Sequence, residues 1–351
     1  MSRLEVCALI MGMLCTGPAC GANDGASRAA AGDGGTVTTG TGAGGTGPGT
    51  GGSSSTGAGT AGAMPAGDCI AAKYPGDVGI ENDPNVILAD DFEDDTQASD
   101  LSQKWDGSHS EPRTRIATEP ENVFHGQKAV EFTLPQSDTE VTAGLSKILT
   151  EKRDVLYLRY YSKFHGPFDV RGSSHNGGVI KGFLDDVPFM PGVPADGTNH
   201  FSAVLDANRG PDEDVPSPGR LHIYSYNPDQ RSQWGDHYYP TGQVIPFSSE
   251  PKDFGPNFVS RPDIIPELDR WYCYELMLKA NTPGQRDGRI TVWLDGAVVM
   301  DFENLRFRDI DSLKINLFLI GFHILKNING EQKKDYDNVV AATSCIGPMV
   351  Q

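Results

Sequence analysis

Short segments rich in β-branched and aromatic residues, separated by turn-rich connections, recur along this chain from residue 129 onward and most constrain its fold. They cover residues 129–134, 155–164, 177–184, 200–207, 220–227, 271–280, 288–302, 313–322 and 335–342. Such residues are enriched in strands, and no long segment repeats its apolar residues at a helical period. Asp295-Gly296 suits a type I′ hairpin turn between two strands. We therefore predict an all-β domain in which two antiparallel sheets stack as a sandwich.

The first 68 residues differ in composition from the rest. Residues 1–20 combine Arg3 with the short apolar run VCALIMGMLC, as a signal peptide does, and the sequence GPAC resembles a bacterial lipobox that would make Cys20 the lipidated first residue. Residues 21–68 follow as a predicted disordered linker, because 15 of the 37 residues from 32 to 68 are glycine. We predict an exported lipoprotein that contacts a membrane only through its anchor, or alternatively a cleaved, freely secreted protein, with one folded domain over residues 69–351.

The predicted domain is acidic. The whole chain has 29 basic and 47 acidic residues, and removing the two basic and four acidic residues of the first 68 leaves 27 and 43, a net charge of −16. This balance argues against nucleic acid as a partner. Cys69 and Cys345 stand at the two ends of the domain, which are often neighbours, so we predict that they form a disulfide in an oxidising compartment. Cys273 is interpreted as a small buried strand residue.

The segment GRLHIYSYNPDQ (219–230) alternates in character from one residue to the next. Its aliphatic residues, Leu221 and Ile223, fall on one face of the predicted strand, and a histidine and two tyrosines fall on the other. Segments 155–164 and 200–207 show the same asymmetry. A polar sheet surface can simply be solvated, but if these strands share a sheet, its aromatic and hydrogen-bonding groups favour a saccharide-binding face. That face would collect Arg159, Tyr161, Lys163, His200, Ser202, His222, Tyr224 and Tyr226.

Three stretches carry a resemblance to a known family. The stretch NTPG…DGRITVWLDG…LRFR within residues 279–308 resembles the C-terminal half of jelly-roll polysaccharide lyases, closest to the alginate-lyase-like family 14. ILADDFEDD (87–95) and DYDNVV (335–340) resemble the ends of concanavalin-A-like jelly rolls. The resemblance implies a concanavalin-A-like jelly-roll sandwich over most of residues 87–342, and sandwiches of this type host lectins, hydrolases and lyases alike.

The resemblance also implies catalytic residues. The family carries a Tyr-x-Tyr pair, which Tyr224 and Tyr226 match, and a Ser-x-Arg pair, of which only Ser202 is present because Val204 stands at the arginine position. The family's lysine follows two glycines, but here Val179 takes that place and Lys181 comes two residues later. Either another residue fills these roles or the activity differs.

A lyase of this kind cleaves a uronic-acid polymer by β-elimination, which needs a base, an acid and a group that neutralises the carboxylate next to the acidic C–H. We assign Tyr224 and Tyr226 as the base and acid pair, without deciding which is which. His175, Asn176 and Arg159 are expected to hold the carboxylate, with Lys181 as a second choice, and no cofactor is required. No pair of carboxylates with the spacing of a retaining glycosidase is found, which disfavours a hydrolase.

Two further expectations complete the hypothesis. The alternative function is a non-catalytic, lectin-like carbohydrate-binding protein of the cell surface, favoured by Val204 and by the acidic balance. A structural Ca²⁺ shared by Asp91 or Glu93 with Asp337 would tie the ends of the domain, although the three are equally interpreted as acidic surface residues. We expect the protein to be a monomer.

Overall fold

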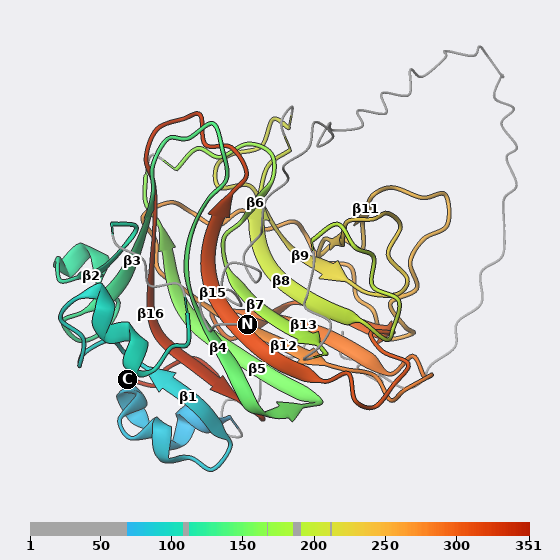
Figure 1. Cartoon of the computed structure of the whole chain (residues 1–351), viewed down its shortest axis with the longest axis horizontal. Coiled ribbons are helices and arrows are strands. Elements are labelled where there is room, and N and C mark those ends of the chain that lie inside the picture. The colour runs from blue at the N-terminus through green and yellow to red at the C-terminus, as the bar shows by residue number, and fades with distance from the viewer. Residues whose placement is uncertain (1–68, 108–111, 167, 185–190, 211–212) are drawn as a thin grey trace, which may run out of the picture. The chain divides into compact units, whose positions relative to one another are not determined.

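The computed structural model describes residues 69–107, 112–166, 168–184, 191–210 and 213–351, and these residues form two antiparallel sheets that face each other (Figure 1). The leader, Cys20 and the linker lie outside the described residues. The only helices among the described residues are 3₁₀ turns: η1 (Ile70–Lys73), η2 (Pro75–Asp77), η3 (Ile80–Asn82), η4 (Ala98–Gln103) and η5 (Pro120–Asn122). No helix in this part of the chain has the length and apolar character to cross a membrane.

Eight strands make up each sheet. The first sheet has the order β14 (Ala297–Leu305), β13 (Gly288–Leu294), β12 (Tyr272–Lys279), β5 (Val155–Phe164), β16 (Gln332–Ala342), β3 (Ala129–Leu134) and β2 (Thr114–Ala117), with β1 (Val86–Asp90) paired to β16. The second has the order β11 (Val244–Ile245), β10 (Asp236–Tyr238), β9 (Arg220–Tyr226), β8 (His200–Asn208), β7 (Gly178–Phe183), β15 (Ile315–Ile324) and β4 (Val141–Arg153), with β6 (Ser174–His175) paired to β15. The predicted all-β, two-sheet jelly-roll fold is confirmed, and Asp295-Gly296 forms the turn between β13 and β14, both with positive φ.

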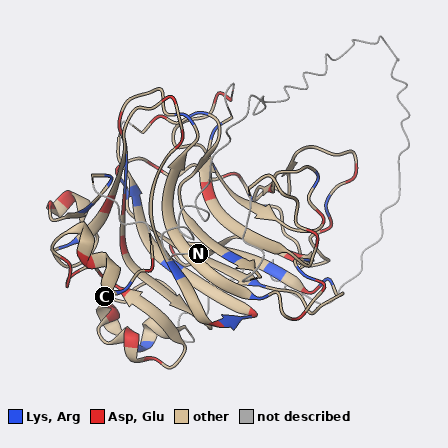
Figure 2. Ribbon diagram, in the orientation of Figure 1, with Lys and Arg blue, Asp and Glu red and all other residues tan. Residues whose placement is uncertain are grey.

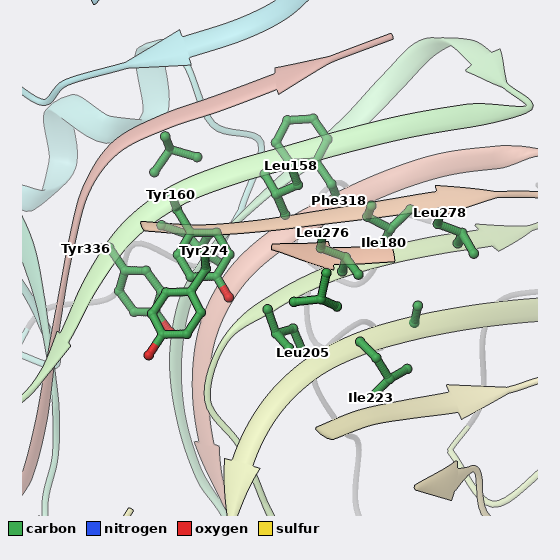
Figure 3. Packing of buried hydrophobic residues seen from close by; sticks show 14 of the residues in the cluster. Leu158, Tyr160, Ile180, Leu205, Ile223, Tyr274, Leu276, Leu278, Phe318 and Tyr336 are labelled. Atoms are coloured by element: carbon green, nitrogen blue, oxygen red, sulfur yellow. The ribbon is translucent and has the colours of Figure 1, made fainter. Parts of the chain in front are cut away.

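The core lies between the inner faces of the two sheets. Figure 3 shows aliphatic side chains such as Leu158 and Leu276 from the first sheet meeting Leu205 and Ile223 from the second. In β9, Leu221 and Ile223 point into this core and are at most 2% exposed. The period-two interpretation of this strand was therefore right, because aliphatic residues at alternate positions can be buried only when the polar positions between them face outward.

The two ends of the domain lie together on the outer face of the first sheet. A disulfide joins Cys69 and Cys345, whose Cα atoms are 5.0 Å apart, as the sequence predicted. Ile70 and Ala71 donate backbone hydrogen bonds to the carbonyls of Cys345 and Ile346. Cys273 is buried and outside the disulfide, as expected of a strand residue.

The prediction that Arg159, Tyr161 and Lys163 would lie on the same face as Tyr224 was wrong. Their strand, β5, pairs with β12 and β16 in the first sheet. Arg159 is fully buried under the chain termini, where its guanidinium forms an ion pair with Asp77. Alternation within one strand shows which residues share a face, but not which sheet the strand joins.

The carboxylates proposed for Ca²⁺ make hydrogen bonds to the backbone. Asp337 accepts three backbone N–H bonds of 2.7–3.1 Å, and one oxygen of Glu93 accepts two, at 2.7 and 2.8 Å. Asp91 accepts the N–H of Glu93 at 3.3 Å. These contacts already stabilise the turns at this end of the domain, and a shared Ca²⁺ stays a prediction.

Removing the disulfide should weaken the whole sandwich. The bond closes a segment with a sequence separation of 276 residues, so replacing both cysteines by serine should lower the free energy of unfolding by about 2–5 kcal/mol. Chemical denaturation followed by tryptophan fluorescence measures this change. An unchanged denaturation midpoint would show that the bridge does not restrain the unfolded chain.

Candidate functional site

The outer face of the second sheet gathers most of the polar residues singled out in the sequence. We call it the tyrosine face, after Tyr224 and Tyr226 of β9. Strand register places Lys181 of β7 opposite Ser202 of β8, and Ser202 opposite Tyr226. Lys181, Ser202 and Tyr226 therefore form one row across three adjacent strands, and Lys181, only a second choice in the sequence interpretation, takes a central position.

The two tyrosines lie side by side under covering loops. Their ring centroids are 5.6 Å apart at an interplanar angle of 88°. The Tyr224 hydroxyl accepts the N–H of Gly235 at 3.0 Å, and the Tyr226 hydroxyl accepts the N–H of Gly192 at 3.0 Å. As a result, Tyr224 is 9% and Tyr226 only 2% exposed. The face is outward, but it is a covered site and not the open floor that the sequence suggested.

Burial and mutual hydrogen bonding separate the acidities of the two tyrosines. Burial raises the pKa of both hydroxyls above the ordinary value. The hydrogen bond between them raises the pKa of Tyr224 further, but lowers that of Tyr226 and partly offsets the effect of burial there. Tyr226 is therefore the better placed of the two to carry a phenolate, and Tyr224 is the better proton donor.

His175 forms a dyad with Asp206 beside Tyr224. Its Nδ1 lies 2.8 Å from the carboxylate of Asp206, which is fully buried, whereas the histidine side chain is 36% exposed. Burial alone would raise the pKa of Asp206, but His175 and further hydrogen bonds lower it below its ordinary value. The ring of His175 lies 5.0 Å from that of Tyr224. The carboxylate on Nδ1 orients the imidazole and leaves Nε2 for other contacts.

Asn176 has a structural position, contrary to its assignment as a carboxylate-binding group. Its side-chain amide donates to the carbonyl of Ala207 at 2.7 Å and accepts the N–H of Ala207 at 3.0 Å. Its backbone N–H donates to Asp206 at 2.8 Å, and the residue is 1% exposed. Asn176 thus pairs with β8 as a strand backbone would, and its amide does not face a substrate.

The glycines after Asn176 are needed for close packing. A Cβ on Gly177 would lie 2.0 Å from the carbonyl oxygen of Leu205, and a Cβ on Gly178 would lie 2.5 Å from the ring of Tyr160. The His-Asn-Gly-Gly sequence therefore brings the backbone close to β8 and to the core, which fixes where His175 stands.

Two histidines that the sequence analysis did not single out join this face. His237 of β10 is paired with Tyr224, and the ring centroids of His222 and His237 are 4.8 Å apart. His323 of β15 lies 5.7 Å from His175. Burial lowers the pKa of His222, His237 and His323, in His323 to about 3. Neither His237 nor His323 falls within a segment predicted as a strand, so no sequence signal indicated that either would reach this face.

Lys181 and His200 are influenced by burial and by each other. Burial lowers the pKa of Lys181 to about 8. It also lowers the pKa of His200 to about 4, with the charge of Lys181 adding to the effect. His200 and Tyr226 are in ring contact at 5.5 Å. Close to neutral pH, Lys181 can supply a positive charge while its histidine neighbour is neutral.

One group of three possible metal ligands occurs in the part of the chain that the structure describes, and it lies on the first sheet. Ligand atoms of Glu131, His165 and Asp335 lie within 4.8 Å of one another beside a cavity of about 440 Å³. Arg115 already pairs with Glu131 at 2.7 Å, and Lys163 lies 3.3 Å from Asp335. A metal ion would have to compete with these cations, so the group fits an ion-pair network better than a metal site.

Charged residues do not form a basic tract among the described residues. Figure 2 shows acidic and basic side chains interspersed along loops and strand ends, with most strand residues uncharged.

Comparisons with solved structures reveal the same fold in alginate lyases. A double mutant of the alginate lyase Aly36B in complex with an alginate trisaccharide is 17% identical, with a TM-score of 0.52 over 74% of this chain and 99% of its own. Alginate lyase vAL-1 from Chlorella virus is 15% identical, with a TM-score of 0.50 over 74% of this chain and 100% of its own. No protein-family model and no curated protein sequence matches the chain.

Replacing Asn176 tests its structural position. Asn176→Ala leaves the buried N–H and C=O of Ala207 without their partner, which should lower the free energy of unfolding by about 1–3 kcal/mol. Asn257→Ala is the control, because Asn257 is exposed and bonds only to Glu303, and it should change stability by less than about 0.5 kcal/mol. Equal stability of the two variants would refute the structural role.

At such low identity, these likenesses establish the fold alone: the chain is a jelly-roll sandwich of the kind seen in polysaccharide lyases.

Proposed function

We propose that this protein cleaves a uronic-acid-containing polysaccharide by β-elimination on the tyrosine face. The observation that carries the proposal is the position of Tyr224, which lies next to the His175–Asp206 dyad on one side and Tyr226 on the other. This places an imidazole paired with a carboxylate and two phenols within one small area, which gives the elimination of a uronate the groups it needs. The fold shared with alginate lyases supports the same reaction class.

His175 and Lys181 are the groups that hold the substrate carboxylate. His175 uses Nδ1 for Asp206 and has a partly exposed ring, so a protonated Nε2 can donate to a carboxylate. Lys181 stands in the row that ends at Tyr226. Withdrawal of negative charge from the carboxylate acidifies the adjacent C–H and stabilises the enolate-like intermediate. Asn176 and Arg159, which the sequence also suggested, have no part in this step.

The tyrosine pair supplies the base and the acid. The phenolate is better stabilised on Tyr226, and Tyr224 keeps its proton more tightly. One oxygen removes the proton next to the carboxylate, the C–O bond to the leaving sugar breaks, and the other hydroxyl protonates that oxygen. Carbon–carbon unsaturation remains on one product, and neither water nor a cofactor is consumed.

An aromatic rim beside the tyrosine face suits the sugar chain. Trp234 is 39% exposed and directly precedes Gly235, whose N–H binds Tyr224. Its ring lies over Gly192, which holds Tyr226. An exposed aromatic ring can stack on the apolar face of a pyranose, as aromatic surfaces do at binding sites. Trp234 would bind a sugar unit next to the one that reacts.

The disulfide of the described domain fits an exported protein. A disulfide between Cys69 and Cys345 persists in an oxidising compartment, where an extracellular polysaccharide is within reach. Together with the leader-like residues 1–20 and the lipobox-like Cys20, this supports a protein tethered to the cell surface.

Phenylalanine at the two tyrosine positions tests the reaction. Tyr224→Phe and Tyr226→Phe should each leave the fold intact and lower turnover by roughly 10²–10⁴, the usual contribution of a positioned acid or base. Absorbance near 235 nm during incubation with uronate polymers measures the unsaturated product. Tyr239→Phe is the control, because Tyr239 lies against Arg220 farther along the same face, and it should retain most of the turnover.

The same variants distinguish the proposed lyase from the alternative function, that of a lectin-like carbohydrate-binding protein. This candidate is favoured by the low exposure of Tyr226 and by Val204, which stands where the resembling lyases have arginine. A binding protein should release no unsaturated sugar, and Tyr226→Phe should weaken its binding by at most about 1 kcal/mol, one hydrogen bond.

The protonation of Lys181 should determine how kcat/KM falls at alkaline pH. Its ammonium holds the carboxylate only while protonated, so kcat/KM should fall as the pH rises through about 8, the value to which burial lowers its pKa. Lys181→Met should lower activity at neutral pH and remove this alkaline limb. Lys279→Met, at a half-exposed position on the first sheet, should retain it. A decline near pH 8 that persists in Lys181→Met would contradict the assignment.

A further inference from the structure

A lysine lies inside the core between the two sheets. Lys334 of β16 is 2% exposed and shares the inner face of the first sheet with Tyr336. Its Nζ is 3.8 Å from the ring centroid of Phe164 and 5.1 Å from that of Tyr336. Burial lowers the pKa of this amine well below the ordinary value. A core position of this kind is normally aliphatic, because burying an amine costs free energy.

The amine of Lys334 reaches across the core to the second sheet. It donates a hydrogen bond to the backbone carbonyl of Asn176. The hydroxyl of Tyr336 lies 3.0 Å from the same carbonyl and 2.7 Å from that of Gly321. Two polar groups of one strand therefore meet a single peptide of the opposite sheet.

A third core residue binds the next peptides of this segment. The hydroxyl of Tyr160 in β5 accepts the N–H of Gly178 at 2.8 Å, and Figure 3 shows Tyr160 and Tyr336 together in the core. Lys334, Tyr336 and Tyr160 thus hold residues 176–178 from the inner side of the sheet. The Asn176 amide in addition bonds the same segment to the backbone of β8.

The segment held in this way carries His175. The backbone N–H of Asn176 and the ring of His175 bind the two oxygens of the same carboxylate, Asp206. A shift of the Asn176 peptide would therefore move the ring relative to Asp206 and to Tyr224. Misplacement of a catalytic group by about 1 Å can cost about 10²-fold in rate.

We propose that Lys334 is a positioning residue, which fixes the backbone of residues 175–178 from the core so that His175 meets both Asp206 and Tyr224. The expected effect of Lys334 on turnover rests on the proposed function, whereas its effect on the position of His175 does not. A methionine has a similar shape and no amine to bury, so stability alone does not explain a lysine here. Groups that break the rules of core composition are most often retained for a functional site.

Lys334→Met tests the proposal. The variant should keep or raise its melting temperature, because an amine is no longer buried. Its kcat should fall about 10- to 100-fold, with a smaller change in KM. The ¹H–¹⁵N signals of the His175 ring should shift, and hydrogen exchange of residues 173–181 should become faster.

Lys252→Met is the matched control. Lys252 is partly buried and lies over a tyrosine ring, 5.0 Å from the centroid of Tyr238, and it donates to Asn227. Among the described residues it forms no hydrogen bond or ion pair with residues 175–178, so the His175 signals and the exchange of 173–181 should stay as in the unmodified protein.

Two results would overturn the inference. One is a folded Lys334→Met variant with unchanged His175 signals and unchanged exchange. If that variant fails to fold, Tyr336→Phe takes its place, because it removes the other donor to the Asn176 carbonyl. Tyr336→Phe should produce the same shifts, and unchanged His175 signals in it would overturn the inference. A wild-type protein that cleaves no uronate polymer would overturn the proposed function, while the spectroscopic shifts would still decide the role of Lys334.

Discussion

The packing of aliphatic side chains between the two sheets determines which residues can reach a ligand. Leu205, Leu221 and Ile223 are buried against the first sheet, and the two-residue period of a strand then sends the residues between them outward. Slipping the register by one residue would bury Tyr224 and Tyr226 in the core and expose the aliphatic side chains. The chemistry of the tyrosine face therefore depends on ordinary core packing.

A buried carboxylate organises the polar part of that face. The side chain of Asp206 is fully buried and bonds to the ring of His175 and the backbone of Asn176. Because an unpaired carboxylate at this position would be costly, its partners are held in place. The core polar groups behind the same segment, Lys334 and Tyr336, complete a network that crosses from one sheet to the other.

The sequence predicted most of the strands, the hairpin turn, the terminal disulfide and the outward face of β9, but no strand at β2, β4, β10 or β11. Local patterns could not predict sheet membership, because the pairing of β5 with β12 and β16 depends on contacts far apart in the chain. For the same reason Arg159 was assigned to the wrong face. Asn176 was misjudged because an amide that pairs with a backbone looks, in sequence, like one that binds a ligand. The loops that cover Tyr224 and Tyr226 gave no signal in the strand itself.

The central claim is that uronate chains bind and react on the outer face of the second sheet. A crystal structure of the Tyr226→Phe variant with a bound uronate trisaccharide tests it most directly. The account predicts a sugar carboxylate within hydrogen-bond distance of Nε2 of His175, with the reacting sugar against Tyr224. A trisaccharide bound instead on the outer face of the first sheet, in the cavities beside Lys163 or Tyr157, would contradict it.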